Sequence, residues 1–598
     1  MRRIRIGGAS GYWGDSAYAT QQLLEKGKVD YLVYDYLAEV TMSLLANARS
    51  KSDELGYATD FVQQILKPNL KNIAEQGVKV VANAGGVNLP ACQKAIQTIL
   101  DEQGIKLKVG VVSGDNLLLR ADEFRADGIT EMTSGDAFPD KLASINSYLG
   151  AFPIAAALDA GADIVITGRV VDSATTLGVL IHEYKWALDD YDKLSMGSLA
   201  GHLIECGCQV TGGNFTDWRD TSDGWADMGY PIVECEHNGQ FIITKPDDTG
   251  GLVSPFTVSE QLIYEIGDPQ AYCLPDVVCD FASVTLLEKS ANKILVCGAK
   301  GYPATHQYKV SATYLDGYRA TYTQLVSGFD VVEKTQITAE RILQRCKTLF
   351  ADLGYDDFRQ SSINLLGANA LWNKDYFPTP DNLLEVVLRM SVHHDKREAV
   401  ALFSREVMGV ILNMTGGRCA AGAAGRPKVS PVINLYSFLL DKSRVSARVD
   451  VDGDDVSFQS IEGEAFDGTQ VKRANVPVAP SNNQQTRQVQ LIELAVARSG
   501  DKGDFANIGV IARRPEYMPY IAAAVTESAI TERFSHILGG RVERFYLPGI
   551  DALNFLMYDA LGGGGVGSMN IDVQGKTYAQ QILMMPVDIP INLLDLVN

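Results

Sequence analysis

The sequence predicts an α/β protein: a large N-terminal domain with a mostly parallel sheet and a β-rich insertion, followed by a small α+β domain. Three observations support this prediction. Short apolar strands alternate with helical stretches of about 10–15 residues through the first third of the chain, which is typical of βαβ units. Helical patterns become sparse at residues 218–332. A stretch at residues 471–489, rich in Pro, Asn and Gln, has no periodicity and reads as a linker.

The predicted N-terminal domain covers residues 1–470, and its first third repeats one strand–helix unit. Its strands are continuous apolar runs, as expected for strands that are buried on both faces of a parallel sheet. Ligands of such sheets bind outside the carboxyl ends of the strands. The predicted strands are Arg3–Gly8, Tyr31–Asp35, Val78–Ala84, Lys108–Ser113 and Ile164–Ile166, and the helices between them are Ser16–Glu25, Leu37–Ala48 and Ala91–Asp101.

The β-rich insertion at residues 218–332 contains a predicted hairpin, Pro231–Lys245, with Asn238-Gly239 as its turn. Residues 490–598 contain several strands and few helices, which is consistent with a ferredoxin-like α+β sandwich. The further strands expected are Asp276–Leu287, Lys293–Gly298, Gln307–Tyr314, Gln490–Arg498, Ile508–Ala512, Val542–Leu547 and Tyr578–Met585, and the further helices are Thr338–Phe350, Leu383–Ser391, Lys396–Met414 and Glu516–Leu538.

The composition is that of an ordinary globular protein, and its charge narrows the choice of partners. The 598 residues are 46% hydrophobic and 21% charged, with a formal net charge of −20. A field of this sign repels nucleic acids and anionic membranes, so we expect neither as a partner. We find no signal peptide and no apolar run long enough for a membrane helix, and the nine scattered cysteines favour reduced thiols, so we expect a cytoplasmic protein. Glycine-rich apolar loops and the acidic surface favour a homo-oligomer.

One stretch, Ala162 to Asp172, predicts a functional edge of the sheet. A buried strand leads into Thr167-Gly168-Arg169, and Asp172 opens a helical pattern that it can cap. A guanidinium beside the N-terminus of a helix attracts an anion, such as a substrate carboxylate. In the alternative interpretation, Arg169 and Asp172 pair with each other and only hold the loop.

The other predicted strands also end in polar or glycine-rich loops, which should meet at the same edge of the sheet. Converging carboxylates raise one another's pKa, which suits general acid–base catalysis. No ligand spacing specifies a metal, so we expect none. The carboxylates are Asp35, Glu39, Asp115 and Asp172, and the candidate catalytic residues are Asp35, Asp115, Arg169 and Asp172. The loop residues expected to bind substrate are Ser10, Gly11, Asn83, Gly85, Gly86 and, from a further glycine loop, Asn214.

The spacing Gly8-x-x-Gly11-x-x-Gly14 after the first strand, with Asp35 at the end of the next, fits a dinucleotide-binding fingerprint. The bulky Tyr12 and Trp13 stand where the backbone would have to approach a pyrophosphate, which argues against this interpretation. A tight strand-to-helix turn is the simpler explanation. In a third interpretation, Ser10 and the amides of the following helix contact a substrate carboxyl or phosphate group.

The most distinctive string lies in the C-terminal domain, Ala497 to Gly509 (ARSGDKGDFANIG). Its polar groups exceed what a turn needs, so we interpret it as a binding loop. The alternative is an ion-paired hairpin loop. The residues of this string expected to bind substrate are Ser499, Asp501, Lys502, Asp504 and Asn507.

At these residues the chain resembles the acyclic terpene utilisation family of AtuA-type proteins. The strings IRIGGASGYWGDS, VVANAGG, DIVITGRVVDSA and CQVTGGNF resemble the first domain of that family, and RSGDKGDFANIGVIARRP resembles the ferredoxin-like domain that follows it. The resemblance covers nearly the whole chain. It implies a role in degrading citronellol and geraniol through branched acyl-CoA intermediates.

The leading hypothesis is an enzyme that acts on a branched unsaturated acyl-CoA, or a related carboxylate, by hydration or lyase chemistry without a cofactor. Arg169 would hold the carboxyl group or a phosphate of the substrate, and Asp35, Asp115 or Asp172 would move protons. Two alternatives remain: a non-catalytic acyl-CoA-binding or scaffold subunit, and an NAD(P)-dependent dehydrogenase.

Overall fold

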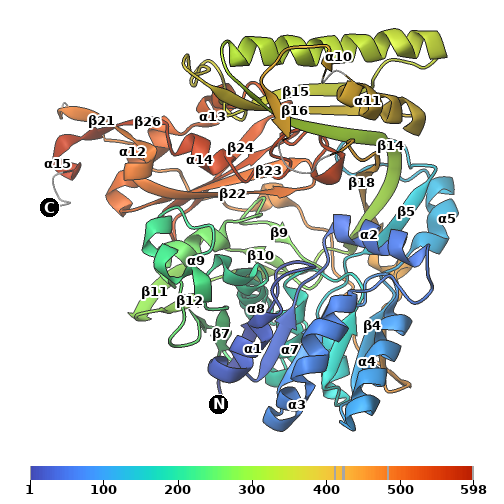
Figure 1. Ribbon diagram of the computed structural model, residues 1–598. Helices are drawn as coiled ribbons and strands as arrows, with labels where there is room; N and C mark the ends of the chain where they lie inside the picture. Colours follow the sequence, from blue (N-terminus) through green and yellow to red (C-terminus); the bar gives the residue numbers. More distant parts are fainter. Residues whose placement is uncertain (1, 410–411, 421–424, 481–483, 595–598) are drawn as a thin grey trace.

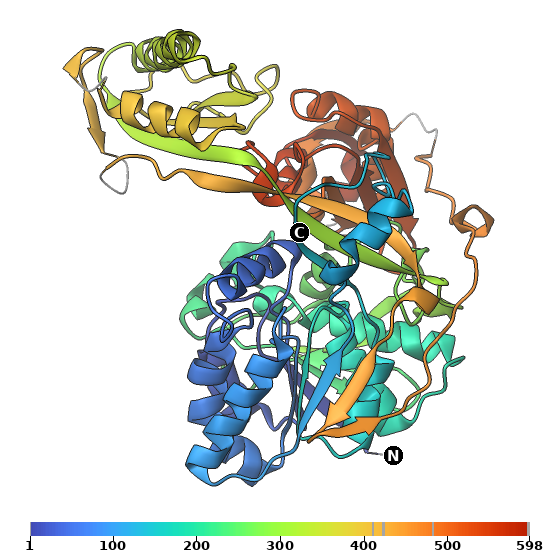
Figure 2. The ribbon, with the colours of Figure 1, turned by 90° about the vertical axis from the view of Figure 1, so that its right-hand side faces the viewer.

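The computed structural model describes residues 2–409, 412–420, 425–480 and 484–594. Within these residues an 11-stranded sheet forms the body of the N-terminal domain, a 6-stranded sheet extends from it into a lobe, and a 4-stranded sheet forms the C-terminal domain. The C-terminal domain lies next to the lobe, on the same side of the main sheet (Figure 1 and Figure 2). Of the described helices, none is long and apolar enough to cross a membrane.

Only the centre of the main sheet is parallel, so the prediction of a mostly parallel sheet holds for five strands. The fifth of them in sequence, β6, inserts between β3 and β4. The strands that flank this centre are antiparallel, and the β-rich segment after residue 218 extends the same sheet. The parallel strands are β1 (Ile4–Gly8), β2 (Tyr31–Tyr34), β3 (Lys79–Ala82), β6 (Ile164–Thr167) and β4 (Val109–Ser113); the flanking strands are β7 (Ile232–Cys235), β8 (Phe241–Thr244), β12 (Lys293–Cys297) and β11 (Thr285–Ser290) on one side and β19 (Arg448–Val451) and β20 (Asp454–Val456) on the other.

Helices cover both faces of the main sheet, which explains why its central strands are apolar throughout. Successive strand residues enter different cores: Ile164 and Ile166 pack in one, and Val165 packs in the other. The helices whose residues enter the first core are α1 (Tyr18–Gln22), α2 (Glu39–Arg49), α3 (Lys67–Gln76) and α4 (Leu89–Gln103), and those of the second are α6 (Phe152–Asp159), α7 (Ala174–Tyr184), α8 (Tyr191–Ile204) and α9 (Pro255–Leu262).

The lobe is built on β14 (Gln307–Ser327), a strand of 21 residues that starts at the N-terminal domain and ends in the lobe (Figure 2). The predicted helix Leu383–Ser391 is wrong. This segment lies in strand β16, where Val386, Leu388 and Met390 are buried alternately against the helices of the lobe. The remaining elements are β5 (Leu142–Ser147), β15 (Gln360–Leu366), β16 (Glu385–His394), β17 (Arg418–Ala420), β18 (Ser430–Asp441), α10 (Val331–Leu353) and α11 (Arg397–Gly409).

The C-terminal domain has an antiparallel sheet in the order β22-β23-β25-β24. Two predictions are wrong here: the segment expected as strand Tyr578–Met585 begins with helix α14, and the single helix expected at Glu516–Leu538 is divided into α12 and α13. The elements are β21 (Thr486–Gln490), β22 (Ala495–Lys502), β23 (Phe505–Ala512), α12 (Met518–Ala524), α13 (Glu527–Arg533), β24 (Val542–Leu547), β25 (Ala552–Met557), α14 (Tyr578–Ile582) and β26 (Pro586–Pro590).

A buried polar contact docks the C-terminal domain on the N-terminal domain. The Thr216 hydroxyl donates to the carbonyl of Ala497 at 2.9 Å and accepts from its N–H at 3.1 Å. Nearby, Arg498 Nη1 lies 3.6 Å from Oε2 of Glu260, whose side chain is 3% exposed. Within the described residues, Oε2 of Glu260 accepts no hydrogen bond. Burial raises the pKa of Glu260 to about 7 although Arg498 opposes the shift.

Candidate functional site

Charged side chains from both domains gather at the carboxyl ends of the parallel strands. Asp35 follows β2, Arg169 follows β6, and Glu39 begins helix α2 (Glu39–Arg49). Lys502, from the C-terminal hairpin, acts electrostatically on Glu39. We name this group the edge cluster; its members are Asp35, Glu39, Tyr148, Arg169, Asp172, Glu205, Lys309 and Lys502.

Arg169 is held by the protein itself. Its Nη1 donates to Asp172 Oδ1 at 2.6 Å and to the carbonyl of Val170 at 2.9 Å. The guanidinium carbon also lies 4.2 Å from the centre of the Tyr148 ring, and the residue is 4% exposed. The structure therefore supports the second interpretation of this stretch, in which Arg169 and Asp172 pair with each other. Asp172 does not cap α7, whose N-cap residue, Ser173, makes no side-chain capping bond.

Asp115 supports the turn that carries Arg169. Its Oδ2 accepts the backbone N–H of Arg169 and a bond from Asn146 Nδ2, both at 2.8 Å. A Cβ atom at Gly168 would overlap this carboxylate, so the turn requires glycine there. Burial raises the pKa of Asp115 to about 6. Asp115 is 2% exposed and its Oδ2 bonds to the turn, which indicates that its role is to position Arg169.

Asp35 lies in the loop before α2, and Glu39 is the first residue of α2. Their electrostatic environments shift the pKa values of the two carboxyl groups in opposite directions. Burial, and then the charge of Asp172, raise the pKa of Asp35 well above its usual range, although Arg169 and a hydrogen bond from Asn83 act against this. Burial also opposes ionisation of Glu39, but the positive charges of Lys309 and Arg169 outweigh it and lower the pKa of Glu39. The two environments therefore push the pKa values of this pair apart, so that Asp35 holds its proton more tightly than Glu39 does.

Two partners hold the Glu39 carboxylate in place. Oε1 accepts a hydrogen bond from the hydroxyl of Tyr148 and lies 3.6 Å from Nζ of Lys309. The exposed fractions of the Glu39 and Lys309 side chains are 22% and 31%, so both can meet a ligand from solution. The Glu39 carboxylate is therefore partly accessible to solvent, as is that of Asp172, which is paired with Arg169.

Lys502 lies at the point where the C-terminal hairpin meets the edge of the main sheet. Its neighbours Tyr272, Asp172 and Glu265 raise the pKa of Lys502 although the surrounding protein opposes its charge. The side chain is nevertheless exposed to water. Lys502 and Lys309 are therefore cations of the edge cluster that reach solvent, whereas Arg169 is buried.

The glycine spacing at Gly8, Gly11 and Gly14 supports a tight turn and not a dinucleotide site. Cβ atoms at Gly8 and Gly11 would overlap backbone atoms of Ile204 and Cys206. The space that a pyrophosphate needs beside these two glycines is therefore occupied by the end of α8.

Comparison with known families identifies the chain. The sequence model of the acyclic terpene utilisation family protein AtuA matches residues 4–451, well over half of the 598 residues. The chain belongs to this family. The AtuA ferredoxin-like domain matches residues 489–588, the segment that forms β21 to β26. No curated protein and no solved structure matches the chain.

The edge cluster of this AtuA family member draws on both matched regions: Asp35 to Lys309 lie in the first and Lys502 lies in the second. The charge of Lys502 acts on Glu39 and that of Asp172 acts on Lys502, so the C-terminal hairpin lies close to the edge of the main sheet. Within the described residues, no group of three His, Cys, Asp or Glu side chains is arranged to hold a metal ion.

Most loop residues predicted to bind substrate have polar groups that bond within the protein, and these bonds fix the shape of the loops at the edge. Gly86 turns with a φ of 54° against Leu45, and Asn214 has a φ of 56°. The bonds run from Ser10 Oγ to the Asp35 carbonyl at 3.1 Å, from the Gly11 N–H to Asp15 at 2.9 Å, from the Gly85 N–H to the Thr167 carbonyl at 3.0 Å, from the Tyr36 N–H to Asn83 at 2.7 Å and from Arg498 to the Asn214 carbonyl.

The C-terminal string is a β-hairpin and not an open loop, which corrects the preferred interpretation. Strands β22 and β23 continue to Lys502 and Phe505 and leave only Gly503-Asp504 as the turn. The internal bonds join Ser499 Oγ to the Gly575 carbonyl at 2.6 Å, Asp501 to Lys576 at 3.2 Å, Asp504 to the N–H groups of Leu561 and Gly563 at 3.1 and 2.9 Å, and Asn507 to the Ile263 carbonyl at 2.6 Å.

Sequence reasoning did not find four residues around the site. Tyr148 and Lys309 contact Glu39 directly. Glu205 raises the pKa of Asp35 and accepts from buried His202, whose Nδ1 lies 2.9 Å from its Oε1. Of these four residues, the one that the sequence could have indicated is Lys309, because a lysine is unusual within the apolar run that begins β14.

Proposed function

We propose that this AtuA family member hydrates a branched α,β-unsaturated acyl-CoA, or removes water in the reverse direction, during acyclic terpene utilisation. The observation that carries the proposal is the opposite shift in pKa of Asp35 and Glu39 beside two accessible lysines. Environments that push the pKa values of neighbouring carboxyl groups apart create an acid and a base that operate at one pH.

Each group has a defined part in the proposed reaction. Glu39 accepts a proton from water while the water oxygen bonds to the β-carbon of the substrate. The π electrons of the carbon–carbon double bond move toward the thioester oxygen, whose negative charge Lys502 stabilises. Protonated Asp35 then gives its proton to the α-carbon, and Glu39 returns the proton it gained to Asp35 through solvent.

The roles of Arg169 and Asp172 change in this proposal. Since they pair with each other, they do not hold the substrate; they keep negative charge beside Asp35 and positive charge beside Glu39. Lys502 and Lys309 replace Arg169 as the groups that attract an anionic or polarised substrate. Charge-assisted hydrogen bonds of this kind are about twice as strong as neutral ones.

The test is turnover of a 3-methyl-branched 2-enoyl-CoA by the full chain. Hydration removes the ultraviolet absorbance of the conjugated thioester and places oxygen from labelled water in the product. We expect Glu39→Gln and Asp35→Asn each to lower kcat by about 10²- to 10⁴-fold, the usual contribution of a positioned acid or base. Glu288→Gln, a change of the same type on the exposed strand β11, serves as the control.

Two results would overturn the proposal. Wild-type turnover that survives in Glu39→Gln would show that another base acts. Saturable binding of the enoyl-CoA without turnover would instead assign the chain a role as an acyl-CoA-binding subunit.

A further inference from the structure

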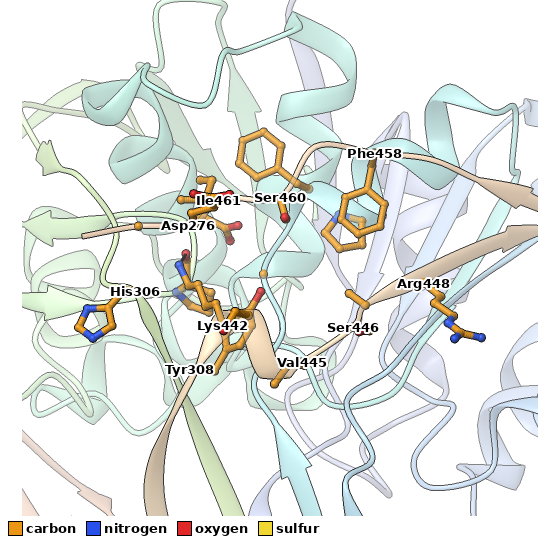
Figure 3. Close-up of a pocket in the computed structure, with 18 of the residues that line it drawn as sticks. Asp276, His306, Tyr308, Lys442, Val445, Ser446, Arg448, Phe458, Ser460 and Ile461 are labelled. Carbon is orange, nitrogen blue, oxygen red and sulfur yellow. Dashed lines mark hydrogen bonds between the residues drawn. The ribbon is translucent and has the colours of Figure 1, made fainter. Parts of the chain in front are cut away.

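Buried basic side chains in this protein differ in the groups that face them. Lys442, which is 8% exposed, borders a polar cavity of about 1000 Å³, where it lies beside Tyr308 and near Asp276 (Figure 3). Its Nζ donates to the carbonyl of Pro275 at 2.7 Å, and burial lowers the pKa of Lys442 to about 8. His202, which is 3% exposed, instead faces a carboxyl group of the edge cluster, so its proton can affect the candidate site.

His202 and Glu205 form a close pair at the end of helix α8. Nδ1 of His202 lies 2.9 Å from Oε1 of Glu205, whose side chain is 11% exposed, so little water competes for this contact. On the other side of the ring, Nε2 lies 3.0 Å from the carbonyl oxygen of Gln261 and 3.2 Å from that of Leu262. Both carbonyls belong to α9. The imidazole ring is therefore held at both nitrogens by groups with oxygen acceptors.

These contacts determine how many protons the pair holds. A carbonyl oxygen can only accept a hydrogen bond, so Nε2 of His202 must carry a hydrogen. An ionised carboxylate also only accepts, so the contact at Nδ1 needs one further proton, either on His202 or on Glu205. His202 lies in the last turn of α8, where the negative end of the helix favours a cation. Burial opposes the charge of the ring, but Glu205 outweighs it and raises the pKa of His202.

The same pair lies against the loop that carries Asp35. A Cβ atom at Gly11 would lie 3.1 Å from the carbonyl oxygen of Glu205, and the neighbouring Ser10 hydroxyl donates to the carbonyl of Asp35 at 3.1 Å. The end of α8 thus packs directly on this loop. After burial and Asp172, the negative charge of Glu205 is a further influence that raises the pKa of Asp35.

His202 decides whether Glu205 can carry that charge. Burial raises the pKa of Glu205 and Asp172 adds to this effect, whereas His202 and Lys502 lower it. His202 both donates a hydrogen bond to the carboxylate and acts on it as a charge, so its loss should let Glu205 take a proton. The other titratable groups that face the pair are Asp35, Glu265, Tyr272 and the thiol of Cys206.

We propose that His202 is a positioning residue that keeps Glu205 ionised, and that the charge of Glu205 makes Asp35 retain its proton until the substrate takes it. His202 acts through Glu205 and does not touch the substrate. The inference rests on the proposed hydration, because that reaction is what uses the proton of Asp35.

The first experiment reads the protonation of His202 by nitrogen-15 NMR of the histidine rings in the full chain. Seven histidines are present, and the signal of His202 is the one lost in His202→Asn. We expect both ring nitrogens to stay protonated at pH 8, where an ordinary histidine with a pKa of about 6.5 is neutral. In Glu205→Gln the ring should be neutral at this pH. If no histidine of the wild-type chain keeps both protons at pH 8, the proposal falls, whether or not the variants fold.

The second experiment follows the ionisation of Asp35 by carbon-13 NMR of the aspartate carboxyl groups, with Asp35→Asn to assign the signal. His202→Asn should lower the pKa of Asp35 by about 1 unit or more, the usual effect of one neighbouring charge. Glu205→Gln should lower it equally, and the double variant no further, because both changes remove the same charge. The matched control is His182→Asn, since His182 pairs with Asp159 in the last turn of α7 and should not affect Asp35.

An unchanged or raised pKa of Asp35 in Glu205→Gln would overturn the proposal, as would decreases that add up in the double variant. Neither measurement needs turnover, so this failure is separate from that of the proposed function. A chain that shows both expected NMR results but hydrates no enoyl-CoA would instead refute the hydration and leave the effect of His202 on Asp35 in place.

Discussion

Replacing Glu260 with glutamine tests what the buried contact between the two domains contributes. In the wild-type chain the Glu260 carboxyl group is enclosed, and its Oε2 lacks a hydrogen bond within the described residues. Its pKa of about 7 exceeds the value of about 4.3 expected in the unfolded chain. The folded state therefore holds this proton more tightly than the unfolded state does.

The direction and size of the change in folding stability with pH follow from this difference between the folded and unfolded pKa values of Glu260. Stability from Glu260 is fully present below about pH 4.3 and is lost as the pH rises through about 7. At 1.36 kcal/mol per pKa unit, the loss reaches about 3 to 4 kcal/mol by pH 8. Glu260→Gln has no such proton to lose and can still accept the N–H of Thr216. The free energy of unfolding of this variant should therefore change less with pH over this range.

The assay compares wild type, Glu260→Gln and Glu288→Gln between pH 5 and pH 8. Hydrogen exchange of residues 209–217 and 495–498, corrected for the intrinsic effect of pH, reports on the docked segments, and thermal unfolding reports on the whole chain. Wild type and Glu288→Gln should lose protection as the pH rises, whereas Glu260→Gln should not. Equal slopes in all three proteins would refute the reasoning.

Three further predictions concern the site and its supports. Tyr148→Phe removes a hydrogen bond to ionised Glu39, so the acidic limb of the pH–rate profile should move up by about 1 to 2 units. Gly168→Ala places a methyl group on the Asp115 carboxylate and should lower stability by about 1–3 kcal/mol, measured by thermal unfolding. Ser499→Ala should lower stability by about 1–2 kcal/mol and leave the KM for an enoyl-CoA unchanged, since its hydroxyl bonds only to protein.

Much of the central sheet could be predicted because its strands are short apolar runs bounded by glycine and polar residues. The same local signals failed at β16 and α14. Leu, Glu, Arg and Met in the β16 segment favour a helix, but the strand forms because pairing with β14 buries Val386, Leu388 and Met390 on one face. Tyr578 and Ile582 resemble a strand in composition, yet they lie on one side of a single helical turn packed in the C-terminal core.

The sequence indicated the edge of the sheet at which the candidate site lies, but not how its side chains pair with one another. Asp35 and Glu39 were found because they follow a strand at the expected edge. Whether Arg169 meets a ligand or pairs with Asp172 depends on distances that the sequence does not contain. Lys309 was missed because it comes from a strand of another sheet, and only the folded chain brings that strand beside Glu39.

Two adjacent residues of β14, Tyr308 and Lys309, contact different partners on the two faces of the strand, and this constrains how the protein can diverge. Loss or gain of one residue at the start of the strand would exchange them, placing a phenol among the carboxylates of the edge cluster and a second ammonium group beside that of Lys442. Beyond the shift in pairing between Leu315 and Tyr318, the same strand runs on into the lobe. Insertions or deletions in the lobe do not change which face of the strand Tyr308 and Lys309 occupy. We therefore expect related chains to vary in length in the lobe but not at the start of β14.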